Sequence, residues 1–377
     1  MIGAAEWSDF EKSYRGRRAS SCPVTSQPGR FRPLWSDWEM DAICRFTRLP
    51  ASKSFRLVTR GNFVQPSAYL GADGTFRPEV MRQIWASGVT IQISNFEDFS
   101  NPLLFLSRNL EAAFRCPVKI HLLFTPGQAQ GLAAHVDDVD ILVLQVQGAK
   151  TWEIYPLNGK DGLAHSETAA FQATDAPTET TLHAGGWLLL QKGRRHEVRN
   201  KGVEPSAHFS ICFLPLTLGD VFQHALDKAR LSVPAFEQGL AAGGEVAEAA
   251  PMGELLLSIL RFAESPDSYY QNYRCLGEPV PKSDLVARGI LDAVDEGTRF
   301  VWRKDSVRID VDKLDLDLAY RRSPLPLRSE LAPIIDKMRQ ADTFHPTEVG
   351  IQDPQASVLL CKFLANVGVL AIAGDAG

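Results

Sequence analysis

Three residues whose side chains bind metal ions stand out in the sequence. His135 and Asp137 are two positions apart, at the start of an apolar run typical of a strand, and His196 follows a second such run. Alternation along a strand would point the first two side chains to the same face. Two imidazoles and one carboxylate on neighbouring strands can occupy one face of an octahedral ion. This is the ligand set of non-haem Fe(II) oxygenases.

A second pair with the same spacing lies nearby. His165 and Glu167 belong to the polar stretch 157–183, which has no strand pattern to hold them in place. Because metal ligands need rigid support, we favour His135 and Asp137 as the pair that binds a metal. A His-x-Asp pair also arises by chance in a chain with eight histidines, so the surrounding pattern must support this choice.

The segments that would position these side chains are predicted to be strands. Six runs rich in β-branched and aromatic residues, bounded by Gly, Pro or Asn, cover residues 88–95, 118–124, 139–146, 151–155, 186–191 and 207–214. The runs 139–146 and 151–155 are joined by four residues that begin with Gln147-Gly148, a spacing that predicts a hairpin. Many short strands separated by turn signals predict a mainly β core, either a barrel or a double-sheet jelly roll.

Helical spacing of apolar residues appears on both sides of these strands. It covers residues 35–46 and 102–114 and, beyond the last strand, 219–240 and 252–264, which Gly243-Gly244 separates. Residues 326–368 again have helical spacing, and a short apolar run that could form a terminal strand follows them. This last part has the outline of a small winged-helix unit.

Composition excludes several classes of protein. The 377 residues are 45% hydrophobic and 23% charged, with a net charge of −5, which is typical of a globular chain long enough for more than one domain. This charge argues against binding nucleic acid through bulk positive charge. Residues 321–377 carry six basic and six acidic side chains, so we expect them to pack or interact with protein rather than bind DNA directly.

Cysteine use and hydropathy bear on the compartment. The six cysteines are far apart and form no Cys-x-x-Cys pair, which favours a reducing compartment over a disulfide framework or a zinc ribbon. The sequence has no apolar run of about 18 residues and no apolar stretch near its start. We therefore expect a cytoplasmic protein without a membrane segment.

The wider pattern around the three candidate ligands resembles the JmjC oxygenases. Residues 135–140 read His-x-Asp-Asp-x-Asp, and an apolar strand follows, with Gln145-x-x-Gly148-x-Lys150-x-Trp152 and then Tyr155. Downstream, residues 186–196 resemble the family segment Gly-Asp-x-Leu-Tyr-x-Pro-x-x-x-x-His. The likeness is strong to the cupin-type ribosomal oxygenases, which hydroxylate protein side chains.

This resemblance implies a fold class and a division of the chain. The core would be a double-stranded β-helix (a cupin-like JmjC jelly roll) over residues 88–215, and residues 1–87 would be a lead-in that packs on it. Residues 216–285 would be a helical segment that forms the dimer interface in relatives. Residues 286–377 would be the winged-helix-like C-terminal domain.

The resemblance also assigns roles to residues. His135, Asp137 and His196 would be the Fe(II) ligands, and Lys150 would pair with the distal carboxylate of 2-oxoglutarate. Chemistry agrees, because a dicarboxylate that binds iron at its keto-acid end needs a buried cation at the other end. The alternative for Lys150 is a solvated lysine in a turn.

Three positions depart from the family pattern. Residues 118–126 align with a strand that usually reads Asn-x-Tyr-x-Thr-Pro, in which His121 replaces the Asn and Leu123 the Tyr, while Thr125 is kept. Cys212 stands where a serine is common. We expect Thr125 and His121 to contact the co-substrate, although a structural histidine in the sheet is an equal alternative for His121. For His208, an inward-pointing structural histidine is the simpler interpretation.

Taken together, these features predict an Fe(II)- and 2-oxoglutarate-dependent dioxygenase that hydroxylates a side chain of a protein or peptide substrate, and that forms a homodimer. Two alternatives remain open. One is a hydroxylase of small molecules or natural products, including ribosomally made peptides, on the same fold. The other is a non-catalytic cupin-like binding protein, which the changes at Leu123 and Cys212 make conceivable.

Overall fold

The computed structural model describes most of the chain. The described residues are 4–16, 20–22, 29–48, 55–156, 176–233, 252–263, 265, 268, 288–304, 307–310, 312–318, 320–321 and 324–373. The alternative ligand pair His165 and Glu167 and the predicted break at Gly243-Gly244 lie outside these residues.

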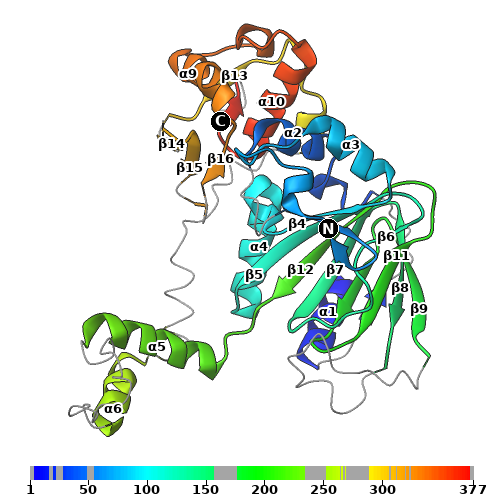
Figure 1. Cartoon of the computed structure of the whole chain (residues 1–377), viewed down its shortest axis with the longest axis vertical. Coiled ribbons are helices and arrows are strands. Elements are labelled where there is room, and N and C mark those ends of the chain that lie inside the picture. Colours follow the sequence, from blue (N-terminus) through cyan, green and yellow to red (C-terminus); the bar gives the residue numbers. More distant parts are fainter. Residues whose placement is uncertain are drawn as a thin grey trace.

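Two antiparallel sheets form the centre of the described structure (Figure 1). The larger has the strand order β1-β10-β7-β12-β5-β4-β2-β3, with bounds Ser20–Cys22, Trp187–Leu190, Asp140–Gln147, Ser206–Phe213, Val118–Thr125, Thr90–Ile93, Phe55–Thr59 and Asn62–Phe63. The smaller has the order β6-β11-β8-β9, with bounds Ala129–Gln130, His196–Asn200, Ala149–Ile154 and Thr178–His183. The predicted mainly β, double-sheet core is confirmed, and each of the six predicted strands is present.

The predicted hairpin between residues 139–146 and 151–155 is wrong. Strand β7 pairs with β10 and β12 in the larger sheet, whereas β8 pairs with β9 and β11 in the smaller one. The chain crosses between the sheets at Gly148, which has a φ of +61°. A Cβ atom there would lie 2.5 Å from the carbonyl oxygen of Pro205, so glycine is required by both backbone conformation and space. This corner joins strands that face each other instead of strands that pair.

Alternation along β5 and β12 divides their residues between two environments. Ile120 and Leu122 on β5, like Phe209 and Ile211 on β12, are fully buried in the main apolar core on the outer side of the larger sheet. The residues between them point to the inside, toward the smaller sheet. The same two strands therefore build the core and the wall of an internal cavity.

Helices cover the outer side of the larger sheet (Figure 1). They are α1 (Ala4–Arg15), α2 (Trp38–Phe46), α3 (Pro78–Ala86) and α4 (Asn101–Phe114), with short 3-10 turns at Arg32–Leu34, Pro66–Ala68 and Phe96–Phe99. Phe10 of α1 packs against the rings of Phe114, Trp187 and Phe213, which fixes this helix over the sheet. The predicted helices at 35–46 and 102–114 are confirmed, although the first starts at Trp38.

A C-terminal unit packs on α2 and α4, and it shares the main apolar core. Its elements are α8 (Arg288–Asp292), β13 (Phe300–Trp302), β14 (Val307–Asp310), β15 (Asp315–Leu318), β16 (Leu325–Pro326), α9 (Ala332–Gln340), α10 (Pro354–Asn366) and β17 (Leu370–Ile372), with 3-10 turns at Ser329–Leu331 and Pro346–Glu348. Buried hydrogen bonds join it to the barrel side. Asn366 Nδ2 donates to Glu39 Oε1 at 3.0 Å, and Arg321 Nη2 donates to Asn101 Oδ1 at 3.0 Å.

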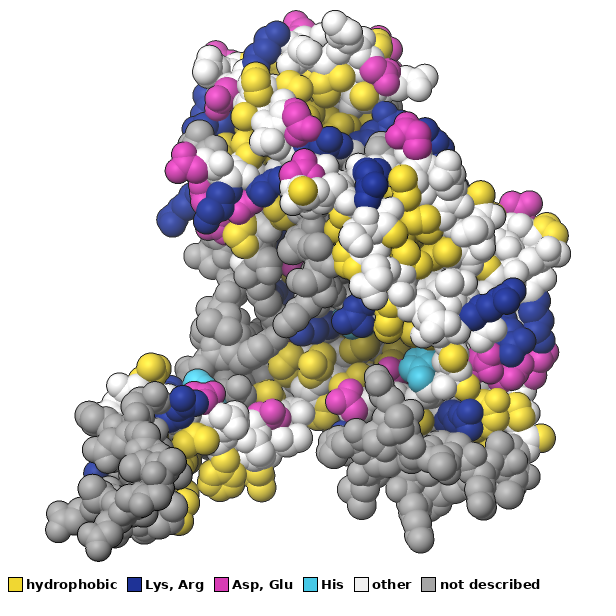
Figure 2. Space-filling model, viewed as in Figure 1, with side chains coloured by type: hydrophobic (Ala, Val, Ile, Leu, Met, Phe, Trp, Pro, Cys, Tyr) yellow, Lys and Arg dark blue, Asp and Glu magenta, His cyan; other side chains and the backbone are white. Residues whose placement is uncertain are grey.

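Helices α5 (Leu218–Ser232) and α6 (Met252–Phe262) form an arm that extends away from the barrel (Figure 1). Thr217 and Asp220 make a reciprocal capping box that starts α5. Hydrophobic side chains gather on the arm (Figure 2), and those that are exposed are Leu218, Phe222, Leu231, Leu256, Leu257 and Leu260. No helix in the described part of the chain has the length and apolar character needed to cross a membrane.

Candidate metal centre

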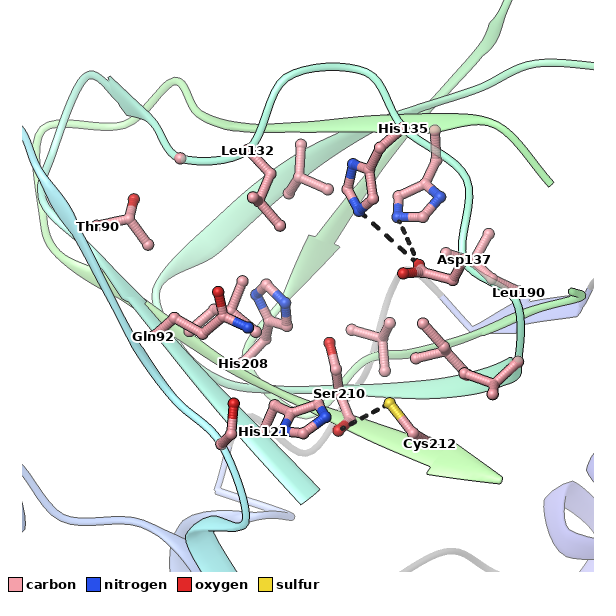
Figure 3. Close-up of a pocket in the computed structure, with 18 of the residues that line it drawn as sticks. Thr90, Gln92, His121, Leu132, His135, Asp137, Leu190, His208, Ser210 and Cys212 are labelled. Atoms are coloured by element: carbon pink, nitrogen blue, oxygen red, sulfur yellow. Dashed lines mark hydrogen bonds and ion pairs between the residues drawn. The ribbon is translucent and has the colours of Figure 1, made fainter. Parts of the chain in front are cut away.

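The three predicted ligands come together, and Figure 3 shows His135 and Asp137 facing each other. Their potential ligand atoms all lie within 4.8 Å of one another. The Nε2 atoms of His135 and His196 are 3.8 Å and 3.5 Å from Asp137 Oδ2. Two imidazoles and one carboxylate that converge in this way have the donor set of a 2-His-1-carboxylate metal site.

Backbone pairing, not strand alternation, positions His135 and Asp137. Both lie in the loop before β7, which corrects the prediction that they stand on a strand. His135 and His196 form an isolated β-bridge, in which each backbone N–H donates to the other's carbonyl oxygen, at 3.0 Å and 2.9 Å. The N–H of Gly193 donates to the carbonyl oxygen of Asp137 at 2.8 Å. The loop is thereby pinned to the end of β11.

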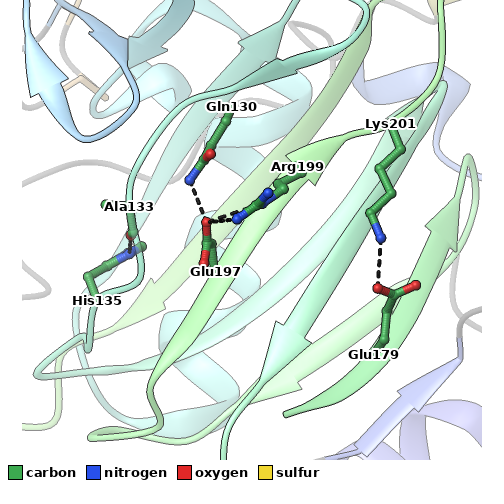
Figure 4. A network of polar contacts seen from close by, with 7 residues as sticks. All are labelled: Gln130, Ala133, His135, Glu179, Glu197, Arg199 and Lys201. Atoms are coloured by element: carbon green, nitrogen blue, oxygen red, sulfur yellow. Dashed lines mark hydrogen bonds and ion pairs between the residues drawn. The ribbon is translucent and has the colours of Figure 1, made fainter. Parts of the chain in front are cut away.

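Each ligand ring is oriented by a backbone carbonyl two residues before it. His135 Nδ1 lies 2.8 Å from the Ala133 oxygen (Figure 4), and His196 Nδ1 lies 3.0 Å from the Arg194 oxygen. A carbonyl can only accept, so each Nδ1 carries the proton and each Nε2 keeps its lone pair. Both free lone pairs face Asp137, which is the arrangement that metal-binding histidines require.

Electrostatics also favour the ligand form of His196. Burial, and then the neighbouring His135, lower the pKa of His196, while Asp137 acts in the opposite direction. A lowered pKa keeps the imidazole neutral near physiological pH, and only the neutral form can bind a metal ion. The residues present therefore fit an Fe(II) ion.

A polar network holds β11 beside the loop that carries His135 (Figure 4). Gln130 of β6 donates to Glu197, next to His196, and Arg199 forms an ion pair with Glu197 at 2.7 Å. Lys201, just after β11, pairs with Glu179 of β9 at 2.7 Å, across the intervening strand β8. Because these pairs are partly exposed, we expect them to align the strands rather than to contribute much stability.

The metal centre opens on a cavity of about 510 Å³ between the two sheets. Both apolar side chains, such as Leu132 and Leu190, and polar side chains of β4, β5, β8 and β12 line the cavity. This volume is in the range of pockets that hold small organic ligands. The cavity contains all the site residues predicted from the sequence: His121, Thr125, His135, Asp137, Lys150 and His196.

Lys150 is not a solvated turn residue. It stands on β8, 2% exposed, and its Nζ donates to the Leu123 carbonyl oxygen at 2.9 Å and lies 2.8 Å from His208 Nδ1. Burial lowers the pKa of Lys150 well below its ordinary value, and no acidic side chain offsets this effect. A cation in this position is one that an anionic ligand would stabilise.

Thr125 and His121 line the same cavity from β5. Thr125 Oγ1 accepts a hydrogen bond from Thr90 at 3.1 Å, and His121 Nδ1 accepts one from the Asn95 backbone N–H at 3.4 Å. Burial and the nearby Lys119 lower the pKa of His121 to about 4, so the ring is neutral. Burial raises the pKa of Cys212 to about 12, which makes it an unreactive thiol in the wall.

His208 points into the barrel, as the sequence predicts. It lines the cavity, with its Nδ1 atom 2.8 Å from Lys150 Nζ. The signal was present in the alternation of residues 207–214, which places His208, Ser210 and Cys212 on one face. Gln92 of β4 also lines the cavity, and its Oε1 atom is buried without a hydrogen-bond partner. The sequence offered no signal for Gln92.

The two facing sheets and the His-Asp-His cluster define a class: double-stranded β-helix proteins with a 2-His-1-carboxylate metal site. The family comparison is specific, because residues 100–221 match the JmjC domain. Residues 100–221 are therefore similar to a JmjC domain, and the chain is similar to curated histidyl-hydroxylases.

Relatives and solved structures give the extent of this similarity. The bifunctional lysine-specific demethylase and histidyl-hydroxylase NO66 of Dictyostelium discoideum is 29% identical over 165 residues, 42% of this chain and 32% of the relative. Its Drosophila mojavensis counterpart is 26% identical over 259 residues, 63% of this chain and 29% of the relative. The chain thus matches about a third of the length of these relatives. The ribosomal oxygenase YcfD of Escherichia coli aligns with 97% of this chain and 98% of its own, at 15% identity and a TM-score of 0.42.

Proposed function

We propose that this protein is an Fe(II)- and 2-oxoglutarate-dependent dioxygenase that hydroxylates a side chain of a protein or peptide. The observation that carries the proposal is that three converging metal ligands and a buried lysine share one cavity of about 510 Å³. A metal centre alone would be compatible with many reactions. An uncompensated cation deeper in the same cavity matches the needs of a dicarboxylate co-substrate.

Each residue then has a defined task. His135, Asp137 and His196 hold Fe(II), which together with 2-oxoglutarate supplies the O₂ chemistry. Lys150 binds the distal carboxylate of 2-oxoglutarate, and Thr125 and His121 form polar parts of the wall beside it. The Trp152 ring stacks near His196, with ring centroids 5.7 Å apart, and keeps water from this side of the ligand.

A protein or peptide is the substrate class that the relatives favour. The similar curated proteins are named as a lysine demethylase and histidyl-hydroxylase, so their substrates carry amino-acid side chains. The metal centre also lies at a partly exposed end of the cavity, since the side chains of His135 and Asp137 are 29% and 31% exposed. An extended side chain could enter there while its main chain stays outside.

The remaining expectations belong to the same proposal. The arm formed by α5 and α6 would pair two copies into a homodimer, and residues 286–377 would act as a winged-helix-like packing unit that does not bind DNA directly. The protein would work in the cytoplasm. The domain boundaries after residues 87, 215 and 285 are proposed from the same family resemblance.

Mass spectrometry tests the proposal. Candidate ribosomal-protein peptides, incubated with the protein, Fe(II) and 2-oxoglutarate, should gain about 16 Da, the mass of one oxygen atom. The Asp137→Ala variant is the control and should leave every peptide unchanged. If 2-oxoglutarate is consumed but no peptide gains mass, while a small molecule does, the natural-product alternative holds. If the wild type binds 2-oxoglutarate without consuming it in any mixture, the protein is a binding module.

A further inference from the structure

In its charged form, the buried Lys150 has more hydrogen-bond donors than the protein uses. It carries three N–H donors and no acceptor. Two of them point at the Leu123 carbonyl oxygen and at His208 Nδ1, at 2.9 Å and 2.8 Å. Lys150 lines the cavity, and no acidic side chain contributes to its pKa. An anion in the cavity would take the third donor and supply the missing negative charge.

The contact with a charged Lys150 also sets the tautomer of His208. When an anion bound beside it keeps Lys150 charged, the ammonium can only donate, so His208 Nδ1 then accepts and the ring proton lies on Nε2. No described residue makes a hydrogen bond with that Nε2. Figure 3 shows the His208 ring projecting into the cavity, and the residue is 2% exposed. Its Nε2–H is therefore a donor that awaits a partner inside the barrel.

The His208 ring packs against Trp152 on one side and faces the cavity on the other. The Trp152 ring meets His208 edge-on, with centroids 5.3 Å apart and planes at 64°. On β5, Leu123 lies directly opposite His208, and on β4, Gln92 lies directly opposite Leu123. Leu123 stands between His208 and Gln92 in this register, and its side chain cannot donate a hydrogen bond. Of these three side chains, the one in contact with Lys150 is His208.

We propose that His208 is a specificity-determining residue, whose Nε2–H binds the same distal carboxylate of the co-substrate as Lys150. The inference rests on the proposed function and deepens it. One carboxylate would accept from the lysine through one oxygen and from the imidazole through the other. The pair would thus select 2-oxo acids that end in a second carboxylate.

A matched pair of variants separates the two ring nitrogens. In His208→Asn the amide oxygen can replace Nδ1 as the acceptor for Lys150, but no donor reaches the position of Nε2. In His208→Gln the longer side chain can place an N–H near Nε2. A matched pair of ligands separates the carboxylate from the rest of the molecule, because 2-oxopentanoate has the same chain as 2-oxoglutarate without the second carboxylate.

The experiment measures the affinity of the Mn(II)-loaded protein for both ligands by calorimetry. We expect His208→Asn to weaken 2-oxoglutarate binding by about tenfold, in line with the loss of a charge-assisted hydrogen bond, and to change 2-oxopentanoate binding less than twofold. His208→Gln should recover most of the affinity. A structural role would weaken both ligands equally in His208→Asn, and that result would overturn the inference, as would unchanged 2-oxoglutarate binding.

The wild-type protein provides the remaining control. If the wild type binds neither ligand, the proposed function itself fails. If the wild type and His208→Asn bind 2-oxoglutarate equally, only the role of His208 fails. If His208→Asn does not fold, nitrogen NMR of the wild-type histidines serves instead. The His208 Nε2–H signal should shift when 2-oxoglutarate binds and stay in place with 2-oxopentanoate. A signal that moves equally with both ligands, or with neither, would overturn the inference.

Discussion

At the scale of single residues, the metal centre depends on backbone carbonyls as much as on its side chains. The carbonyl oxygens of Ala133 and Arg194 set the tautomers of His135 and His196, so that both Nε2 atoms face Asp137. The ligands are thus oriented before any ion arrives, which lowers the entropic cost of binding. The positions of the three side chains could be predicted from spacing and resemblance. Their orientation could not, because it comes from backbone groups: the bridge between His135 and His196 and the carbonyl oxygens that hold the rings.

Removal of one ligand should abolish metal binding without unfolding the protein. His196→Ala and Asp137→Ala should each bind Mn(II) at least about a hundredfold more weakly than the wild type, because two remaining donors cannot hold the ion. Circular dichroism should remain unchanged, since the barrel is stabilised by its apolar cores. Full metal affinity in either variant would show that other residues bind the ion.

Lys150→Ala should weaken 2-oxoglutarate binding by at least about tenfold, because loss of one partner of a desolvated charge pair costs about 2 kcal/mol or more. Metal affinity should change little, because the ligands are other residues. Lys150→Arg should restore part of the binding, since its charge remains but its planar group needs different geometry. Equal 2-oxoglutarate affinities in calorimetric titrations of wild type and Lys150→Ala would mean that another group holds the co-substrate.

The pH dependence of stability should include His121. Its pKa is lowered to about 4 in the folded state, so the unfolded chain binds more protons as the pH falls below its ordinary value of 6.5. The stability that this residue contributes is full above pH 6.5 and is lost as the pH falls toward 4. His121→Asn should therefore lose less stability than the wild type between these pH values in urea titrations. Identical slopes in the two proteins would contradict the lowered pKa.

At the scale of elements, the strands that could be predicted from the sequence were the hydrophobic ones. Strands with continuous apolar runs, such as β7 and β12, were found from the sequence. Strand β9 was missed, because Thr178–His183 is polar and mostly exposed. Strand β11 was also missed, since four of its five residues are polar: His196, Glu197, Arg199 and Asn200. The false hairpin at Gly148 has the same origin: spacing along the chain does not distinguish a turn within a sheet from a corner between sheets.

Gly148→Ala tests this corner. The added Cβ would lie 2.5 Å from the Pro205 oxygen, at a φ of +61° that side chains rarely adopt. We expect it to destabilise the protein by about 2 kcal/mol or more, and to lower the 2-oxoglutarate affinity, because Lys150 follows two residues later. The control is Gly289→Ala, where nothing lies within 4 Å of the new atom. Equal melting temperatures for the two variants would contradict the role of Gly148.

At the scale of the whole molecule, the barrel is joined to two different structures. The C-terminal unit shares the main core and is attached by buried hydrogen bonds such as that between Asn366 and Glu39. The α5–α6 arm leaves large apolar side chains exposed instead, with Leu256, Leu257 and Leu260 each more than half exposed. Such a surface usually marks an interface, and the commonest arrangement of two copies is a symmetric pair.

Light scattering should find a dimer in solution that Leu257→Asp with Leu260→Asp converts to a monomer. Burying two carboxylates in an apolar interface is unfavourable unless they are paired. The double variant should still bind 2-oxoglutarate, because the arm lies apart from the cavity. Glu254→Ala, an exposed polar change on the same helix, is the control and should stay dimeric. A monomeric wild type would remove this proposal.

The central claim is that one cavity binds Fe(II) through His135, Asp137 and His196 and binds 2-oxoglutarate through Lys150. Anaerobic equilibrium dialysis against Fe(II) and 2-oxoglutarate tests both halves at once. The wild type should retain one Fe(II) and one 2-oxoglutarate per chain, Asp137→Ala should retain neither at the same concentrations, and Lys150→Ala should retain the metal but not the co-substrate. Retention of both ligands by Asp137→Ala, or of neither by the wild type, would contradict the claim.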